Sequence, residues 1–124
     1  MFNWLKPKKQ ETPPPAPPPE PEPPAVQEIT AKQLKELLAA PEPPLVLDVR
    51  EAYELPDGIV PGSVHIPMRF IPTRLAELPR DRPIVAYCAA GVRSYHVAEF
   101  LLAQGYGDVK SLAGGLMAWQ APDH

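Results

Sequence analysis

Apolar and polar positions alternate in blocks from about residue 27 onward, and the block lengths separate strands from helices. Short apolar runs bounded by turn residues predict buried strands at 45–49, 64–66, 84–87 and 109–112. Apolar residues at helical spacing predict helices that begin at 31, 71, 94 and 116. Strands that alternate with helices are typical of an α/β domain, so we expect a largely parallel central sheet flanked by helices.

Local signals mark the ends of these helices. Thr30 and Gln33 have the spacing of a capping box, which predicts that the first helix begins at residue 31 and ends before Pro41. The second helix is expected over 71–78, with Pro72 in its first turn. The third is expected over 94–104, because Gly105 follows as a natural stop, and a short closing helix is expected over 116–119.

Proline dominates the chain before residue 27 and divides it into two parts. Residues 13–24 hold nine prolines in twelve positions, a composition that favours polyproline II and has no core to pack on. We therefore expect residues 1–26 to form a disordered proline-rich tail or linker, and residues 27–121 to form one small domain. Near the start of the chain, the apolar side chains of Phe2 and Trp4 lie close to Lys6 in the sequence. This leaves open a role for the tail as an anchor or as a binding site for a partner.

Composition excludes several classes of protein. A single cysteine among 124 residues rules out a disulfide framework or a cysteine-rich metal site, and the three histidines lack metal-ligand spacing, so no metal site is expected. A formal net charge of −3 argues against nucleic acid as a partner. No apolar run is long enough to span a membrane and nothing resembles a secretory signal, so we expect a cytoplasmic location in which a free thiol survives.

The candidate catalytic residues come directly after the third predicted strand, 84–87, where the single cysteine stands. Cys88 is followed by small residues and Gly91, then by Arg93 and a predicted helix. Such a loop can direct backbone N–H groups and a helix N-terminus at one point, which favours the thiolate of Cys88. A strand, a cysteine, an anion-binding loop and a helix together indicate a cysteine nucleophile.

Four stretches, taken together and in order, resemble the single-domain rhodanese family over residues 27–121. They are LDVRE at 47–51, PGSVHIP at 61–67, YCAAGVRS at 87–94 and GGLMAW at 114–119. The resemblance implies a small rhodanese-like α/β domain and a thiosulfate sulfurtransferase activity. In that reaction Cys88 would take the sulfane sulfur of thiosulfate or of another persulfide donor.

The persulfide on Cys88 would then pass its sulfur to a thiol or to cyanide, and no cofactor is required. The substrate would be bound by the loop that follows the cysteine, at Ala89, Ala90, Gly91, Val92 and Arg93. Arg93 can hold the anionic head of the donor. Asp48 and Arg50 are expected to brace the site, and Ser94 to cap the helix or to contact the sulfur.

Alternatives to a small-molecule enzyme stay open. A cysteine phosphatase or arsenate reductase would use a similar loop, but Arg93 lies five positions after Cys88, whereas the phosphatases that share the fold place arginine six positions after the cysteine. A non-catalytic binding module is a second alternative. A persulfide carrier that serves a protein sulfur acceptor is a third, and the sequence does not distinguish it from the enzyme.

Overall fold

A parallel five-stranded sheet forms the centre of the computed structural model, which describes residues 12–19 and 25–122. Its strand order is β1-β5-β4-β2-β3, and every neighbouring pair is parallel. The strands are β1 (Gln27–Ile29), β2 (Leu45–Asp48), β3 (Val64–His65), β4 (Ile84–Tyr87) and β5 (Val109–Leu112). The predicted α/β class and parallel sheet are confirmed, whereas β1, which has only three residues, was not predicted.

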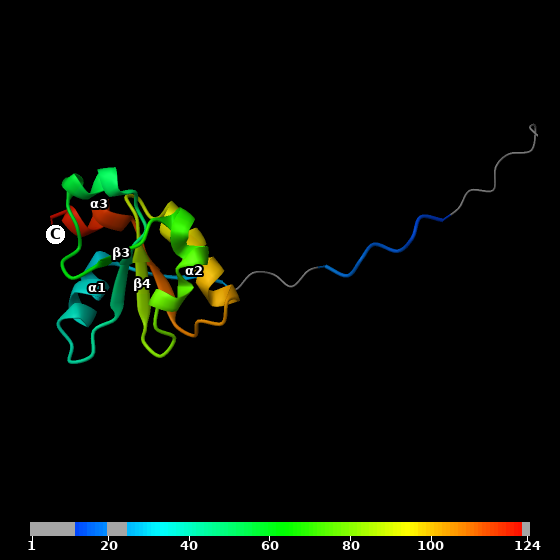
Figure 1. Ribbon diagram of the computed structural model, residues 1–124, viewed down its shortest axis with the longest axis horizontal. Helices are drawn as coiled ribbons and strands as arrows, with labels where there is room; N and C mark the ends of the chain where they lie inside the picture. The colour runs from blue at the N-terminus through cyan, green and yellow to red at the C-terminus, as the bar shows by residue number, and fades with distance from the viewer. Residues whose placement is uncertain (1–11, 20–24, 123–124) are drawn as a thin grey trace, which may run out of the picture.

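Helices cover both faces of this sheet (Figure 1). The α-helices are α1 (Ala31–Leu38), α2 (Val92–Ala103) and α3 (Gly115–Gln120), and the 3-10 helices are η2 (Ala52–Asp57), η3 (Met68–Thr73) and η4 (Leu75–Glu77). One hydrophobic cluster lies between the sheet and α2, and a second lies between the sheet and the pair α1 and α3. Alternation along β4 sends the side chain of Cys88 to the α2 side and that of Tyr87 to the α1 and α3 side.

The capping box at the start of α1 is present as predicted. The Thr30 hydroxyl accepts the Gln33 N–H at 3.1 Å, and the Gln33 side chain accepts the Thr30 N–H at 2.9 Å. The start of α2 was predicted two residues late, because Gly91 has φ +104° and occupies the N-cap position before Val92. A positive φ is a conformation that glycine adopts at no steric cost, so this glycine lets the helix begin inside the cysteine loop.

The predicted α-helix over 71–78 is wrong. The chain forms η3 and η4 there, separated at Arg74, whose φ of −119° is not helical. Pro72 lies inside η3 and offers no N–H, so an α-helical ladder cannot run through this stretch. Pro56 likewise lies inside a 3-10 helix, η2, which ends at Asp57.

Of the predicted tail, the structure describes residues 12–19 and 25–26, which have no helix or strand; the former are all exposed. The disorder expected for the whole of residues 1–26 falls largely outside the described residues and stays a prediction. Within the described ranges, none of the helices has the length and apolar character needed to cross a lipid bilayer.

Candidate active site

Cys88 follows β4 directly, at the carboxyl edge of the sheet, and its side chain is 1% exposed. Three hydrogen-bonding groups surround its sulfur. The N–H of Gly91 lies 3.1 Å from Sγ, the N–H of Ser94 lies 3.4 Å away, and the Ser94 hydroxyl lies 3.5 Å away. The loop therefore directs two backbone N–H groups and one hydroxyl at the Cys88 sulfur.

These contacts change the acidity of the thiol. Burial of Cys88 opposes ionisation, but the Ser94 hydroxyl and the N–H groups of Ser94, Gly91 and Ala90 outweigh it, so the pKa of Cys88 lies below its usual value. A lowered pKa in a buried cysteine is characteristic of a nucleophile, because a structural thiol in an apolar core shifts in the opposite direction.

Ser94 is held in place by a partner on the neighbouring strand. Its hydroxyl lies 2.8 Å from the Ser111 hydroxyl on β5 and donates to the Gly91 carbonyl at 3.3 Å. Ser94 lies in the first turn of α2 and does not cap it, since Gly91 occupies the N-cap position. The geometry therefore places Ser94 against the sulfur, and its two further contacts fix the hydroxyl beside Cys88.

Arg93 lies beside the cysteine loop and forms a bidentate ion pair with Glu54 of η2. Its Nη1 and Nη2 donate to the two carboxylate oxygens at 2.7 and 2.8 Å. The hydrogen bonds from Arg93 lower the pKa of Glu54 to about 2, and the carboxylate raises the pKa of Arg93 in turn. A guanidinium carries five N–H donors, so this pair leaves others for an anion. The Arg93 side chain is 32% exposed and can be reached from solvent.

Asp48 and Arg50 form a buried ion pair at the end of β2. Arg50 Nε donates to Asp48 Oδ1 at 2.9 Å, and Nη2 donates to Oδ2 at 2.7 Å. The Tyr87 hydroxyl donates to the same carboxylate at 2.8 Å, and Arg50 also donates to the carbonyls of Glu54 and Gly58. Burial opposes ionisation of Asp48, but these hydrogen bonds prevail and hold its pKa below the usual range. The pair thus ties η2, which carries Glu54, to the sheet.

The structure brings the predicted site residues to one edge of the sheet but arranges them in two groups. Cys88, Gly91 and Ser94 meet at the sulfur, whereas Asp48 and Arg50 hold the segment that carries the partner of Arg93. Ala90 and Val92 are exposed at the surface of the loop, and Ala89 is partly exposed.

Sequence reasoning missed three residues that contact this set, namely Glu54, Tyr87 and Ser111. Glu54 and Arg93 are 39 positions apart, and Ser94 and Ser111 are 17 apart. No local pattern links partners at such separations. The only available signal was the spacing of Glu51 and Glu54, which form a capping box at η2.

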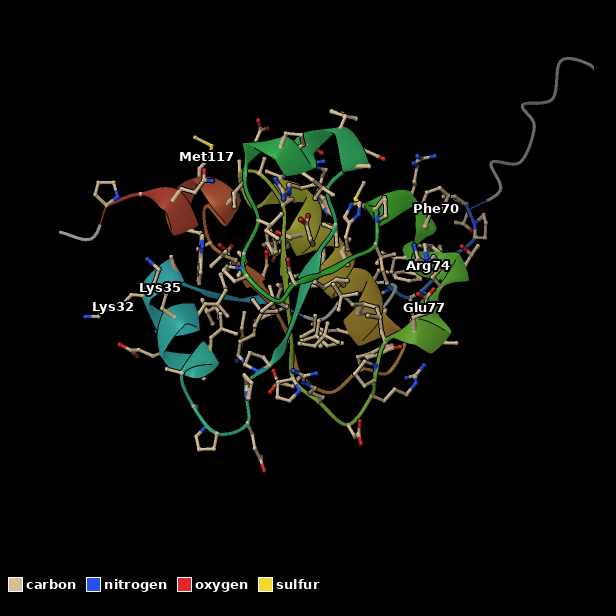
Figure 2. All side chains as sticks on the ribbon, turned by 60° about the vertical axis from the view of Figure 1, so that its left-hand side comes forward. Lys32, Lys35, Phe70, Arg74, Glu77 and Met117 are labelled. Atoms are coloured by element: carbon tan, nitrogen blue, oxygen red, sulfur yellow. The ribbon has the colours of Figure 1, made fainter. Side chains whose placement is uncertain are left out.

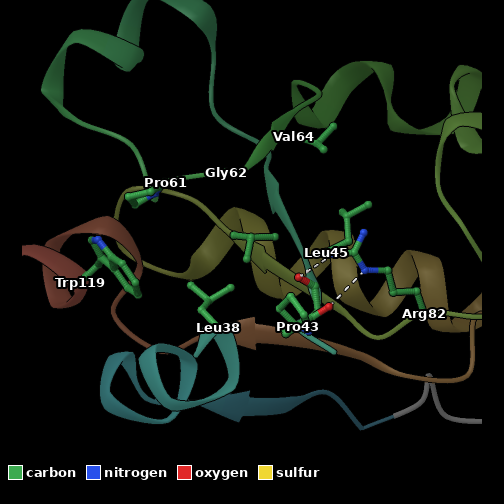
Figure 3. Close-up of a pocket in the computed structure, with 10 residues that line it drawn as sticks. Leu38, Pro43, Leu45, Pro61, Gly62, Val64, Arg82 and Trp119 are labelled. Atoms are coloured by element: carbon green, nitrogen blue, oxygen red, sulfur yellow. Dashed lines mark hydrogen bonds between the residues drawn. The ribbon is translucent and has the colours of Figure 1, made fainter. Parts of the chain in front are cut away.

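A separate pocket lies between the end of α1, the start of β2 and Trp119 (Figure 3). Its lining is mostly apolar, and its one charged residue, Arg82, donates to the carbonyls of Pro43 and Pro44. None of its lining residues belongs to the Cys88 loop. Across the part of the chain that the structure describes, no group of three or more His, Cys, Asp or Glu side chains is placed to hold a metal ion.

Comparison with known proteins gives one consistent result. Residues 30–122 match the family described as "Rhodanese-like domain". A sulfurtransferase from Allochromatium vinosum is 43% identical over 94 residues, which cover 76% of this chain and 88% of that protein. A thiosulfate sulfurtransferase, GlpE, from Pseudomonas savastanoi is 35% identical over 77 residues, 62% of this chain and 73% of that protein.

Among solved structures, a rhodanese-like domain protein from Staphylococcus aureus superposes with a TM-score of 0.72 at 36% identity. The match covers 76% of this chain and 91% of that one. The sequence relatives and the structural relative agree over the same single domain.

Proposed function

This chain belongs to the rhodanese-like domain family and is a sulfurtransferase, and from that premise we propose that it moves a sulfane sulfur from thiosulfate or a persulfide donor to a thiol or cyanide through a persulfide on Cys88. The observation that carries this proposal is the set of donors around the Cys88 sulfur, with the Gly91 N–H at 3.1 Å and the Ser94 N–H at 3.4 Å. Fixed dipoles of this kind stabilise a negative sulfur without having to reorganise.

In the first half-reaction the Cys88 thiolate attacks the outer sulfur of thiosulfate. A bond forms between the two sulfur atoms, the bond from the outer sulfur to the sulfonate sulfur breaks, and sulfite leaves with the electron pair. The enzyme then carries a persulfide whose terminal sulfur is again negative. The same N–H groups can serve both anions, which is why a ring of backbone donors suits this reaction better than one charged side chain.

In the second half-reaction an external acceptor removes the sulfur. Cyanide or a thiolate attacks the terminal sulfur, the bond to Cys88 breaks, and the Cys88 thiolate is regenerated. Cys88 is the only cysteine of the chain, so no second thiol is present to resolve the persulfide internally. This supports a ping-pong scheme in which donor and acceptor react in turn.

Arg93 is proposed to bind the anionic head of the donor while Glu54 holds its guanidinium in place. The relative named thiosulfate sulfurtransferase makes thiosulfate the first donor to test. Arg93→Ala should weaken kcat/KM for thiosulfate by about 1.5–3 kcal/mol, the size of a hydrogen bond to a charged group. Arg69→Ala is the matched control, because Arg69 also pairs with a glutamate of this region, Glu51, but is 64% exposed.

Initial rates with thiosulfate and cyanide both varied test the scheme directly. Parallel lines in double-reciprocal plots are expected for a covalent sulfur-enzyme intermediate. Intersecting lines would contradict it, since they require donor and acceptor to be bound together.

The physiological acceptor and the compartment belong to the same proposal. A thiol that works as a thiolate requires a reducing environment, which supports a cytoplasmic location. The partners are then a small sulfur donor and either a small thiol or the thiol of a carrier protein. If cyanide accepts sulfur quickly and low-molecular-weight thiols do not, a protein acceptor becomes the favoured partner.

A further inference from the structure

The first turn of α3 sits directly on the backbone of the cysteine loop. The Leu116 N–H donates to the Cys88 carbonyl at 2.8 Å, and the Met117 N–H donates to the Ala89 carbonyl at 3.1 Å. These two donors belong to the segment GGLMAW, whose part in the chemistry is not explained by contacts to the sulfur.

Peptide planarity connects these two bonds to the sulfur. In a trans peptide the C=O of one residue and the N–H of the next point in opposite directions, and the described residues contain no cis peptide bond. When Met117 holds the Ala89 carbonyl, the Ala90 N–H must face the other way. The next N–H along the loop, that of Gly91, lies 3.1 Å from the Cys88 sulfur, so the Ala89 peptide that Met117 holds leads directly into the group that contacts the sulfur. The N–H of Ala90 also lowers the pKa of Cys88.

Gly115 allows this close approach. A Cβ atom at this position would lie 2.3 Å from the Cys88 carbonyl oxygen and 2.7 Å from the Ala89 carbonyl carbon, which no side chain can occupy. Its φ of +59° is also a conformation that favours glycine. Gly62 has a similar φ of +79° but nothing within 4 Å of the corresponding Cβ position. A substitution at Gly62 therefore shows the effect of the unfavourable φ without that of a steric clash.

Side chains on the other side of α3 hold it in position. Leu116 is buried in the cluster shared with α1, and the Trp119 ring lies 5.2 Å from the Lys35 ammonium of that helix. The Met117 side chain, by contrast, is 68% exposed and points away from the domain (Figure 2). The contribution of Met117 to the loop is therefore its backbone N–H and not its side chain.

We propose that Gly115, Leu116 and Met117 are positioning residues for the nucleophile: their backbone fixes the carbonyls of Cys88 and Ala89, and so sets the peptide planes that lead to the Gly91 N–H at the sulfur. The inference rests on the proposed role of Cys88 and goes beyond it, because it makes the reactivity of the Cys88 thiol depend on residues 115–117, which begin 27 positions after Cys88. These residues act through the loop and do not touch the substrate.

The test is the pH dependence of Cys88 alkylation by iodoacetamide in the whole protein. Met117→Pro removes the N–H that holds Ala89, and Met117→Ala keeps it while removing the same exposed side chain. We expect Met117→Pro to raise the midpoint of the alkylation profile by about one pH unit, a tenfold loss of thiolate below the midpoint, and Met117→Ala to leave the midpoint unchanged. Alkylation needs no sulfur donor, so this result does not depend on whether the protein transfers sulfur.

A second pair covers the case in which Met117→Pro does not fold. Gly115→Ala should raise the midpoint of the alkylation profile, whereas Gly62→Ala, with the same unfavourable φ and open space around it, should lower only the melting temperature. The proposal is overturned if folded Met117→Pro or Gly115→Ala is less stable than the parent but keeps its alkylation midpoint, since α3 would then be a structural support alone.

Discussion

Two buried ionisable groups lie at the carboxyl edge of the sheet, Asp48 at the end of β2 and Cys88 directly after β4, and their surroundings differ. The Cys88 sulfur faces N–H groups and a hydroxyl that follow it within six positions of the chain. The Asp48 carboxylate receives hydrogen bonds from the backbone and side chain of Arg50 and from Tyr87, 39 positions away.

The two surroundings differ in the charge that faces each group. Asp48 is paired with a full positive charge and saturated with donors, so its negative charge is fully compensated and nothing is left to react. The groups that contact the Cys88 sulfur directly carry partial charges, which favour its thiolate without neutralising it. We infer that the chemistry belongs to Cys88 and that the Asp48–Arg50 pair holds the segment that carries Glu54.

The largest expected effect is on activity, from Cys88→Ser. We expect sulfur transfer to be abolished and the free energy of unfolding to stay within about 1 kcal/mol of the parent, because serine is close in size and keeps a hydrogen-bonding group. Cyanide-dependent thiocyanate formation and urea unfolding measure the two quantities. Activity near that of the parent would remove Cys88 from the mechanism.

The converse variant is Asp48→Asn, which leaves Arg50 buried without its counter-charge. We expect a loss of about 3–5 kcal/mol in the free energy of unfolding, the cost of breaking a buried ion pair. At temperatures where the variant is still folded, turnover per folded molecule should fall far less than in Cys88→Ser. A variant that keeps its stability and loses turnover would show that Asp48 takes part in the chemistry.

A smaller effect is expected from Glu54→Gln, and it depends on pH. The folded-state pKa of Glu54 is about 2, below its ordinary value of 4.5, so its contribution is complete above pH 4.5 and lost as pH falls toward 2. We expect the variant to lack about 1–3 kcal/mol of stability at neutral pH, and the gap to the parent to close in acid.

The matched control for this variant is Glu77→Gln. Glu77 forms a similar two-pronged pair with Arg74, but both side chains are more than a third exposed (Figure 2). Surface pairs contribute little, so the stability of this variant should follow that of the parent at all pH values. Equal pH dependence for the two variants would mean that the Glu54–Arg93 pair is no more than a surface contact.

The smallest expected effect is from deleting residues 1–26. Residues 12–19 are all exposed, and among the described residues of this segment Val26 alone packs against the core, so we expect kcat and KM to be unchanged for small substrates. A change in turnover for thiosulfate would show that the tail contributes to the site and is not a spacer.

The same contrast explains how much of the molecule the sequence predicted. Four of the five strands, the α1 capping box and the loop around Cys88 were predictable, because each depends on residues close together in the chain. The Glu54–Arg93 pair, the Tyr87 hydroxyl and the Ser111 contact were not, because the fold brings these partners together. The α-helix predicted over residues 71–78 is wrong for a local reason. Pro72 and the non-helical Arg74 interrupt a stretch whose apolar residues otherwise have helical spacing.

Intact-protein mass spectrometry after incubation with thiosulfate shows whether Cys88 carries the transferred sulfur. We predict a mass gain of one sulfur atom on the parent protein, none on Cys88→Ser, and loss of the gain on addition of cyanide. A parent protein that turns over thiosulfate without ever gaining this mass, or a Cys88→Ser variant that gains it, would show that the sulfur is not carried on Cys88.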